Sequence, residues 1–535
     1  EVIIFQVRPI AASSNPENKH DGKLKNRVEE LKQQFENMSK KKHHLAGNKN
    51  CFGDMPDWNP AEIIGDNPNY LDYSLYDYLI TDSIWHKART SQGYSNVDPA
   101  QLVVLFGNKP YIDIRNTFNS FIPEKIPRPI KEKLMKFYFD KLQKNPELQD
   151  KVEFDILFTC YDLSFDKKSD ELKDFGFSDE EISLLKESLL ELTNNLILES
   201  KKSIKKDMNA VFEMSKTRDS ILKSDRNSVD KKLECAKKLL DDCKNNGTLQ
   251  FSRLARLAFI GNIILKSMVA EKIIDKKSYN SLLNSVKTVA KKMNDDFTLL
   301  IEGKMNENKF LKFYGHLRPG SYDITSPRYD NNPNLLKGKN PIKIDEEYKE
   351  FEADKETYTK INAELGKHGI KVSADLLFNF IKSSLESREL SKFEFTKNLS
   401  EAIELIAEAG EKLGFSRQDT ANLDVKTLFL AIRENENETF SIWKETIDKR
   451  KNDRKEKSKL ELPPIIFSPR DFDIVTYYSS KPNFITQKKI EAEIVAVSHV
   501  KGQNIPNLKD KIVLIENGDP GYDWIFTKNP AGLIT

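Results

Sequence analysis

Cysteine is scarce in this sequence, and the few cysteines present are not spaced as metal ligands. Four occur among 535 residues, at positions 51, 160, 235 and 243, and no two of them form a Cys-x-x-Cys pair. A disulfide-built domain needs a much higher density, and a structural zinc site needs paired ligands. We therefore expect reduced thiols, no zinc site and a cytoplasmic protein.

Charge of one sign and long apolar runs are missing as well. Lys and Arg total 85 against 83 Asp and Glu, a formal net charge of +2, and the basic residues are interleaved with acidic ones. A protein that coats nucleic acid gathers its positive charge on one face. Residues 254–265 form one of the longest apolar stretches, but Asn262 interrupts it and it is shorter than the roughly 20 residues of a membrane-spanning helix. The sequence predicts neither a nucleic-acid partner nor a membrane partner.

Apolar residues recur at helical spacing over most of the chain. Ser178 and Glu181 form a capping-box pattern, and apolar residues follow at steps of three or four as far as Leu196. Residues 250–270 are apolar on most sides, which is typical of a helix buried in a bundle. Further helices are expected over residues 23–40 and 399–413. With 38% hydrophobic and 31% charged residues, the chain is predicted to be a mainly α-helical globular protein.

The two ends of the chain differ from this helical middle. Short runs rich in β-branched residues at 2–5, 462–467, 490–497 and 511–515 are separated by turn residues, as buried strands are. Residues 45–69 are rich in Gly, Asn, Pro and Asp and are expected to form a loop. The charge-dense residues 449–459 are expected to be a solvated helix end or a linker. The prediction is therefore a large helical centre flanked by α/β ends.

Polar and aromatic residues gather in three segments of the middle. Residues 54–62 combine acids with Trp58, and residues 111–115 alternate polar and apolar side chains as a half-buried strand does. Residues 314–329 hold His316 and two arginines among Gly and Pro. Such a loop is either a hydrogen-bonded structural element or a ligand-binding one, and His316 is either a structural histidine or a proton shuttle. The residue types leave both alternatives open.

Two further groups of polar residues suit anions. Residues 387–397 place Arg388 and Lys392 four apart on one face, at an expected helix junction, where they form either interhelical ion pairs or an anion clamp. Gln6 and Arg8 are two apart in a predicted strand and therefore point the same way. An amide beside a guanidinium suits a phosphate or a metal-bound phosphate, and it is equally compatible with a surface pair at the end of a strand.

Taken together, these segments resemble the phosphoenolpyruvate-utilising phosphotransferases, the family of phosphoenolpyruvate synthase, pyruvate phosphate dikinase and rifampicin phosphotransferase. Residues 4–10, Ile-Phe-Gln-Val-Arg-Pro-Ile, resemble the last strand of the family's ATP-grasp domain. Residues 510–515 and 518–535 resemble the opening of its swivelling phosphohistidine domain. Residues 314–329 are similar to a motif of the rifampicin phosphotransferase branch, with Tyr329 where that branch usually has Trp.

The resemblance implies a domain order. Residues 1–12 would be the last strand of the ATP-grasp nucleotide-binding domain, residues 13–460 a helical acceptor-binding domain, and residues 461–535 a linker with the first part of the phosphohistidine domain. The rest of the nucleotide domain would precede Glu1 and the nucleophilic histidine would follow Thr535, in the same polypeptide. These 535 residues alone are then expected to be inactive.

The resemblance also implies a reaction. ATP, with Mg²⁺, phosphorylates the histidine and releases AMP and phosphate, and the histidine then carries the phosphoryl group to a small-molecule acceptor bound by the central domain. One branch, the glutamine kinases of capsule phosphoramidate biosynthesis, phosphorylates the side-chain amide nitrogen of L-glutamine. In this chain the resemblance implies that Gln6 and Arg8 contact the nucleotide and that Gln6 also lies near the metal. It implies that His316 and Asp323 transfer protons. The residues implied to bind the phosphate or the acceptor are Trp58, Tyr111, Arg115, Arg318, Arg328 and Arg388.

Two other interpretations stay open at this point. The chain could belong to a phosphoenolpyruvate synthase-like enzyme that acts on pyruvate, or it could be a helical scaffold without a catalytic role. A scaffold would not need Gln6 and Arg8 on one face of a strand, nor the beginning of an α/β unit after residue 460.

Overall fold

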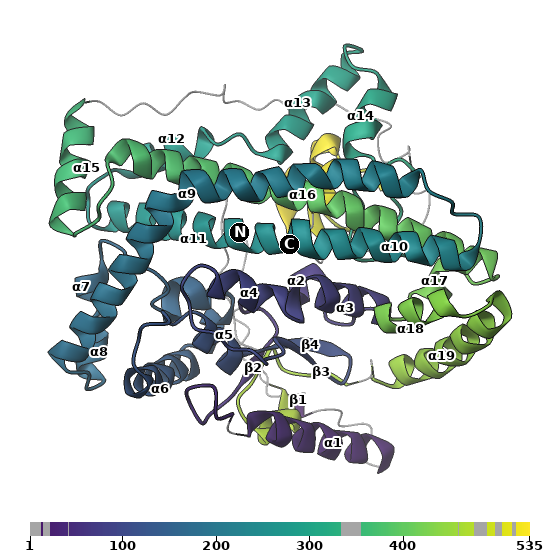
Figure 1. Ribbon diagram of the computed structural model, residues 1–535, viewed down its shortest axis with the longest axis horizontal. Coiled ribbons are helices and arrows are strands. Elements are labelled where there is room, and N and C mark those ends of the chain that lie inside the picture. Colours follow the sequence, from purple (N-terminus) through teal and green to yellow (C-terminus); the bar gives the residue numbers. More distant parts are fainter. Residues whose placement is uncertain are drawn as a thin grey trace. The chain divides into compact units, whose positions relative to one another are not determined.

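Helices make up most of the structure, which confirms the prediction of a mainly α-helical protein (Figure 1). The computed structural model describes residues 12–13, 22–40, 42–332, 355–457, 460–475, 489–497, 506–515 and 520–535. By the contacts among its residues the chain divides into two compact units. Unit 1 comprises residues 1–68, 94–159 and 448–487, and unit 2 comprises residues 69–93, 160–447 and 488–535.

Unit 1 is built around a four-stranded antiparallel sheet. The strand order is β3 (Val103–Phe106), β4 (Lys109–Asp113), β2 (Phe52–Gly53) and β5 (Ile465–Ile466). The amphipathic helix α1 (Gly22–Ser39) packs Leu31 and Phe35 into one cluster with the aromatic side chains of this sheet. The remaining elements of unit 1 are β1 (Ala12–Ser13), which pairs with β6 (Ile474–Val475), α2 (Pro60–Ile63), α5 (Ile114–Ser120), α6 (Arg128–Lys144), and the short helical turns Pro146–Lys151, Val152–Ile156 and Pro469–Phe472.

The prediction of a half-buried strand over residues 111–115 is wrong in two respects. The strand β4 ends at Asp113, whose carboxylate accepts a hydrogen bond from the Asn116 amide and so begins α5 at Ile114. All five side chains are buried, because β4 lies between β3 and β2 and the helix that follows it is buried as well. The polar–apolar alternation therefore does not separate a solvent face from a core face.

Unit 2 is a helical bundle whose longest members are α9 (Asp179–Leu222), α10 (Val229–Cys243), α11 (Leu249–Ala270) and α16 (Ala374–Lys412). These helices pack against one another along their lengths (Figure 1). The predicted capping box is present at the start of α9, and α11 is buried on most sides, as its sequence predicts. The other helical elements are α3 (Tyr70–Tyr76), Asp77–Thr81, α4 (Ile84–Thr90), α7 (Phe165–Lys168), α8 (Asp170–Asp174), Lys244–Thr248, α12 (Lys276–Asn284), α13 (Val289–Ile301), α14 (Glu307–Tyr314), α15 (Lys355–Lys367), α17 (Arg417–Thr420), α18 (Val425–Leu430) and Ala431–Arg433. The helix α19 (Glu436–Lys457) begins in unit 2, and its residues from Asp448 onward are assigned to unit 1.

The helix junction expected near Arg388 is absent, because α16 runs without a break through residues 387–397. No proline occurs between Ala374 and Lys412, and Gly410 lies only two residues from the end of the helix. The hydroxyl of Ser391 bonds the Arg388 carbonyl of the same helix at 3.0 Å, so the polar residues here do not interrupt it. Ion-rich composition alone was a poor indicator of a helix end.

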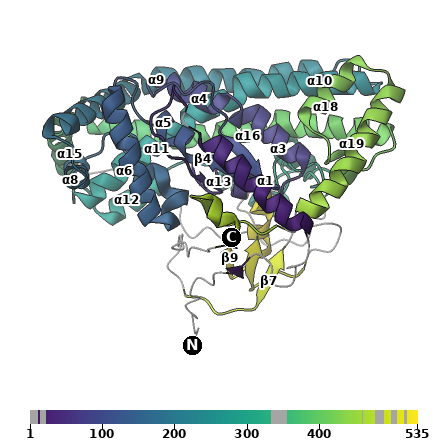
Figure 2. The ribbon, with the colours of Figure 1, turned by 90° about the horizontal axis from the view of Figure 1, so that it is seen from below.

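The C-terminal part of unit 2 is a small parallel sheet. Its strands are β7 (Ile494–Val497), β8 (Ile512–Ile515) and β9 (Gly532–Ile534), with the helical segment Pro520–Lys528 between β8 and β9 (Figure 2). Val497, Val513 and Ile515 face a hydrophobic cluster that includes residues of α13 and α14. The strand predicted over residues 511–515 is thus confirmed, whereas the one expected from 490 begins at Ile494. Within the described residues no helix has both the length and the apolar character needed to cross a membrane.

Candidate functional site

The loop that follows α14 brings together most of the polar residues singled out in unit 2. Two backbone bonds close it: the Tyr329 amide donates to the Leu317 carbonyl at 2.9 Å, and the Asp330 amide donates to the Gly315 carbonyl at 3.2 Å. A compact loop with closed ends and no regular secondary structure is a frequent carrier of function. We call residues 315–330 the closed loop. His316, Arg318, Asp323 and Arg328 all lie on it.

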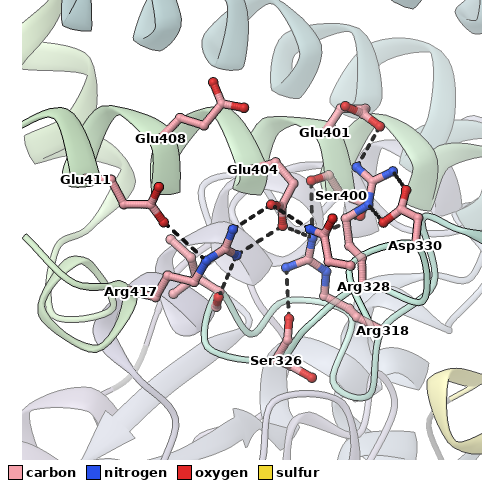
Figure 3. A network of polar contacts seen from close by, with 12 residues as sticks. Arg318, Ser326, Arg328, Asp330, Ser400, Glu401, Glu404, Glu408, Glu411 and Arg417 are labelled. Atoms are coloured by element: carbon pink, nitrogen blue, oxygen red, sulfur yellow. Dashed lines mark hydrogen bonds and ion pairs between the residues drawn. The ribbon is translucent and has the colours of Figure 1, made fainter. Parts of the chain in front are cut away.

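Arg318 fastens the closed loop to α16 from inside the protein (Figure 3). Its side chain is 1% exposed and forms an ion pair with Glu404 at 2.8 Å. It also donates to the Ser400 hydroxyl at 3.0 Å and to the Ser326 carbonyl at 3.3 Å. Burial lowers the pKa of Arg318 and the charge of Glu404 opposes that shift, so the pair depends on both partners being present.

Glu404 holds a second arginine as well. Arg417 of α17 donates to the other oxygen of the same carboxylate at 2.6 Å and to the Ile324 carbonyl of the closed loop at 3.2 Å. Burial alone would raise the pKa of Glu404, but the hydrogen bonds and charges of Arg417 and Arg318 outweigh burial and lower it. A single carboxylate therefore connects the closed loop, α16 and α17.

Arg328 has two acidic partners of its own. It bonds Asp330 at 2.6 Å and Glu401 of α16 at 2.7 Å, and its side chain is largely buried. Three arginines are thus paired with four carboxylates, those of Asp330, Glu401, Glu404 and Glu411 (Figure 3). All three guanidinium nitrogens of Arg328 and both terminal nitrogens of Arg318 bond the protein itself, whereas Nε of Arg318 has no partner among the described residues. This network therefore orders the loop and adds little free positive charge.

Asp323 is engaged within the closed loop. Both of its carboxylate oxygens accept from the Thr325 hydroxyl, at 2.7 and 3.0 Å, and one also accepts from the Thr325 amide at 2.8 Å. Such a side-chain turn fixes the local backbone. In the structure Asp323 stabilises a turn, and the proton-transfer role that the resemblance implies for it stays a prediction.

His316 is buried in the closed loop, and one of its ring nitrogens is not engaged. The residue is 7% exposed, and its ring centre lies 4.8 Å from that of Phe393 on α16. Among the described residues Nε2 has no hydrogen-bond partner. Burial, followed by the charges of Lys397, Arg328 and Arg218, holds the pKa of His316 well below its usual value of 6.5. The imidazole is therefore neutral at physiological pH.

The cations around His316 come from separate helices. Lys397 of α16 lies 4.6 Å from the centre of the Phe393 ring and pairs with Glu394 at 2.7 Å. Burial, opposed by Glu394 and reinforced by Arg218 and Lys292, lowers the Lys397 pKa. Arg218, near the end of α9, donates to the Asn398 side chain at 2.8 Å. Positive charge thus surrounds a neutral, buried imidazole.

Arg388 lies apart from the arginine network. It is 13 residues before Glu401 on the same helix, a separation of about 20 Å at the rise of an α-helix. Its guanidinium lies 5.1 Å from the centre of the Phe259 ring, and its nearest acidic partner is the adjacent Glu389 at 3.7 Å. The structure brings His316, Arg318, Asp323 and Arg328 together and leaves Arg388 outside that group.

The other predicted substrate-binding residues belong to unit 1. Arg115 donates to the carbonyls of Met38 and Lys40 at 3.0 Å each and of Ser39 at 3.3 Å, and so binds the C-terminal end of α1. The Tyr111 hydroxyl donates to the Pro463 carbonyl at 2.5 Å. Trp58 is half-buried in the loop before α2. The contacts of Arg115 and Tyr111 hold elements of unit 1 together, and a role in binding an acceptor remains a prediction.

The implied nucleotide and metal contacts, Gln6 and Arg8, lie outside the described residues. Within the part of the chain that the structure describes, no three His, Cys, Asp or Glu side chains lie close enough to hold a metal ion. The structure therefore offers no described donor set for the Mg²⁺ that the resemblance implies, and we derive no step through it.

Sequence reasoning missed five charged participants: Glu404, Glu401, Asp330, Arg417 and Arg218. A signal for the first was present, because Glu401, Glu404, Glu408 and Glu411 recur at steps of three or four and so line one face of α16. An acidic stripe beside an arginine-containing loop indicates ion pairing. Nothing in the sequence indicates that Arg218, nearly 100 residues before His316, approaches it.

Comparison with known proteins adds no family assignment. No protein-family model matches this chain, and a search of curated proteins finds no match either.

Proposed function

We propose that this chain is the acceptor-binding part of an ATP-dependent phosphotransferase that works through a phosphohistidine carrier. The acceptor is a small molecule with an N–H or O–H nucleophile, and the side-chain amide of L-glutamine is the first candidate. The closed loop on α16 is the acceptor site. The carrier is the histidine that the family resemblance implies to follow Thr535, and ATP is the phosphoryl source.

The observation that carries the proposal is a shared hydrophobic cluster. Val513 and Trp524 belong to the segment that resembles the opening of the phosphohistidine domain, and they pack in one cluster with Tyr314 and Tyr329. Tyr314 and Tyr329 flank the part of the closed loop that holds His316 and Arg318. A carrier attached to this C-terminal segment would thus begin its movement close to the acceptor site.

The local chemistry supports transfer to this loop. Phosphoryl transfer requires mainly positioning of the two reactants and stabilisation of negative charge. The network of Arg318, Glu404 and Arg417 holds the loop in one conformation. Lys397 and Arg218 supply positive charge beside the neutral His316. A covalent carrier divides the overall transfer into two easier displacements.

The test uses the complete gene product with ATP, Mg²⁺ and one candidate acceptor at a time, L-glutamine first and pyruvate second. We expect AMP to form in proportion to the acceptor consumed. Phosphorus NMR of the product then distinguishes a phosphoramidate, a phosphate ester and phosphoenolpyruvate by their chemical shifts. A protein that forms neither AMP nor an acid-labile phosphohistidine with ATP would contradict the proposal, and phosphoenolpyruvate as the product would assign the synthase-like activity instead.

A further inference from the structure

Two buried nitrogens of the closed loop, Nε of Arg318 and Nε2 of His316, have no hydrogen-bond partner among the described residues, and only that of His316 can act as an acceptor. Buried polar atoms are nearly always hydrogen-bonded, since an unsatisfied one costs about 1–3 kcal/mol. His316 is 7% exposed and its Nε2 has no partner among the described residues. An orphaned buried nitrogen in a loop held by three arginines points to a missing ligand group.

The contact made by the other ring nitrogen of His316 determines whether the missing group is a hydrogen-bond donor or acceptor. The imidazole also bonds the main chain of Phe313, in a contact that raises the pKa of His316 and therefore uses the carbonyl as acceptor. Because Nε2 is unpartnered, this bond assigns the ring proton to Nδ1. In the neutral ring Nε2 then carries a lone pair, and only a hydrogen-bond donor can satisfy it.

The charged groups that face the ring keep it in this form. Arg218 of α9, Arg328 of the closed loop and Lys397 of α16 all disfavour the imidazolium. Glu394 is the acidic group next to them, and it pairs with Lys397 at 2.7 Å. Lys397 and Arg218 would bind an incoming anion, and the negative charge of a bound phosphoryl group would offset these cations, so that the neutral ring can accept a proton from the nucleophile.

We infer that Nε2 of His316 is the general base that takes the proton of the acceptor's nucleophile, with Lys397 and Arg218 holding the phosphoryl group. This inference rests on the proposed function and adds the catalytic residue and the substrate class, a neutral N–H or O–H nucleophile. Nε2 is shielded from solvent, so acceptor binding has to displace the side chains that cover it. Phe393, which is half-buried, lies 4.8 Å from the His316 ring, and Lys397 lies over the Phe393 ring.

The step is balanced as follows. The N–P bond of the phosphohistidine breaks, and a bond forms between phosphorus and the nitrogen or oxygen of the acceptor. The acceptor's proton passes to Nε2 of His316, and the carrier imidazole that leaves takes a proton from solvent. His316 returns its own proton to solvent before the next turnover, so the net change is the exchange of a phosphoryl group for a proton on the acceptor.

A single-turnover experiment tests the base directly. The complete gene product is charged with ATP, freed of nucleotide and mixed with L-glutamine. We expect His316→Asn to slow transfer about 10²- to 10⁴-fold, the usual contribution of a general base, and to leave charging of the carrier unchanged. His368→Asn is the matched control, because His368 bonds Tyr161 at 3.1 Å elsewhere in unit 2. Equal transfer by wild type and His316→Asn would overturn the inference.

Rescue by imidazole separates catalysis from folding. His316→Gly leaves space for a free imidazole, and we expect added imidazole to restore part of the transfer rate in this variant and none in His316→Asn. A folding defect would not respond to imidazole in this way. Failure of rescue in a His316→Gly protein that charges normally would count against the base role.

A second measurement tests the protonation of His316 without requiring the acceptor to be known. Nitrogen-15 NMR of histidine-labelled protein, assigned with His316→Asn, should show a neutral ring with the proton on Nδ1 at pH 7. A protonated ring, or a proton on Nε2, would overturn the inference. If wild type is not charged by ATP, the proposed function fails; if it is charged and the NMR shows the wrong tautomer, only this inference fails.

Discussion

The carboxylate of Glu404 lies 2.8 Å from the guanidinium of Arg318, a side chain that is 1% exposed and 86 residues away in sequence. The pair joins an irregular loop to the C-terminal third of a 39-residue helix. A fully buried charge has no water to replace a lost partner, so removal of Glu404 leaves Arg318 uncompensated, whereas Glu404 without Arg318 still pairs with Arg417. The order of the closed loop therefore depends on this contact.

Glu404→Gln should destabilise the protein by about 3–5 kcal/mol, as loss of one partner of a buried ion pair does. Urea unfolding at pH 7 measures the change. Glu411→Gln is the matched control on the same face of α16: Glu411 is 59% exposed and 3.8 Å from Arg417, so its loss should cost less than about 1 kcal/mol. Equal effects of the two substitutions would show that Arg318 does not depend on Glu404.

The Glu404→Gln deficit should also depend on pH. The pKa of Glu404 is lower in the folded protein, so its contribution is present above the pKa of an unfolded glutamate and is lost as the pH falls through the folded value. Unfolding free energies of wild type and variant should thus converge in acid. A deficit that stays constant down to the lowest accessible pH would assign it to lost packing instead.

The contribution of Asp54 of unit 1 to the free energy of unfolding should depend on pH in the opposite direction to that of Glu404. Burial raises its pKa from 3.8 to about 6, although Lys109 lies 2.7 Å away and opposes the shift. A raised carboxyl pKa favours the folded state at low pH, and that contribution is lost as the pH rises from about 4 to about 6. Over this range wild type should lose about 3 kcal/mol relative to Asp54→Asn, measured as unfolding free energy. Parallel pH curves would contradict the raised pKa.

Arg115→Lys tests whether this residue holds α1 or binds an acceptor. Lysine cannot reproduce three bonds from a planar fork to the carbonyls of residues 38–40, so we expect a loss of about 2–3 kcal/mol in urea unfolding. Arg470→Lys, at an exposed position of unit 1, should be neutral. In the complete gene product the KM for the acceptor should stay unchanged; a raised KM with unchanged stability would instead support the predicted binding role.

Arg318→Ala and Arg328→Ala, combined in the complete gene product, should reduce acceptor phosphorylation while phosphohistidine formation from ATP continues. The expected reason is loss of loop order, because both guanidinium groups bond α16. Acceptor turnover and carrier charging are measured on the same samples. Unchanged turnover would remove both residues from the acceptor site, and loss of charging would indicate a global defect.

Several local features could be read from the sequence because they depend on neighbouring residues. Ser178 and Glu181 satisfy each other's backbone donors at the start of α9, whatever the rest of the chain does. The apolar residues of 250–270 cover most sides of the helix, which requires burial in any fold. The junction expected near Arg388 failed because charge pattern does not stop a helix that lacks proline.

Some features of the candidate site could likewise be predicted from the sequence, and others depend on the tertiary structure. The sequence by itself determined that His316, Arg318, Asp323 and Arg328 share one loop, since they lie within 13 residues of each other. Only the tertiary structure decided that Glu404 pairs with both Arg318 and Arg417, that Arg218 approaches His316, and that Arg115 binds a helix end. Ion pairing and the protonation of a buried ring depend on distance and on exclusion of water, and both are set by packing between segments far apart in the chain.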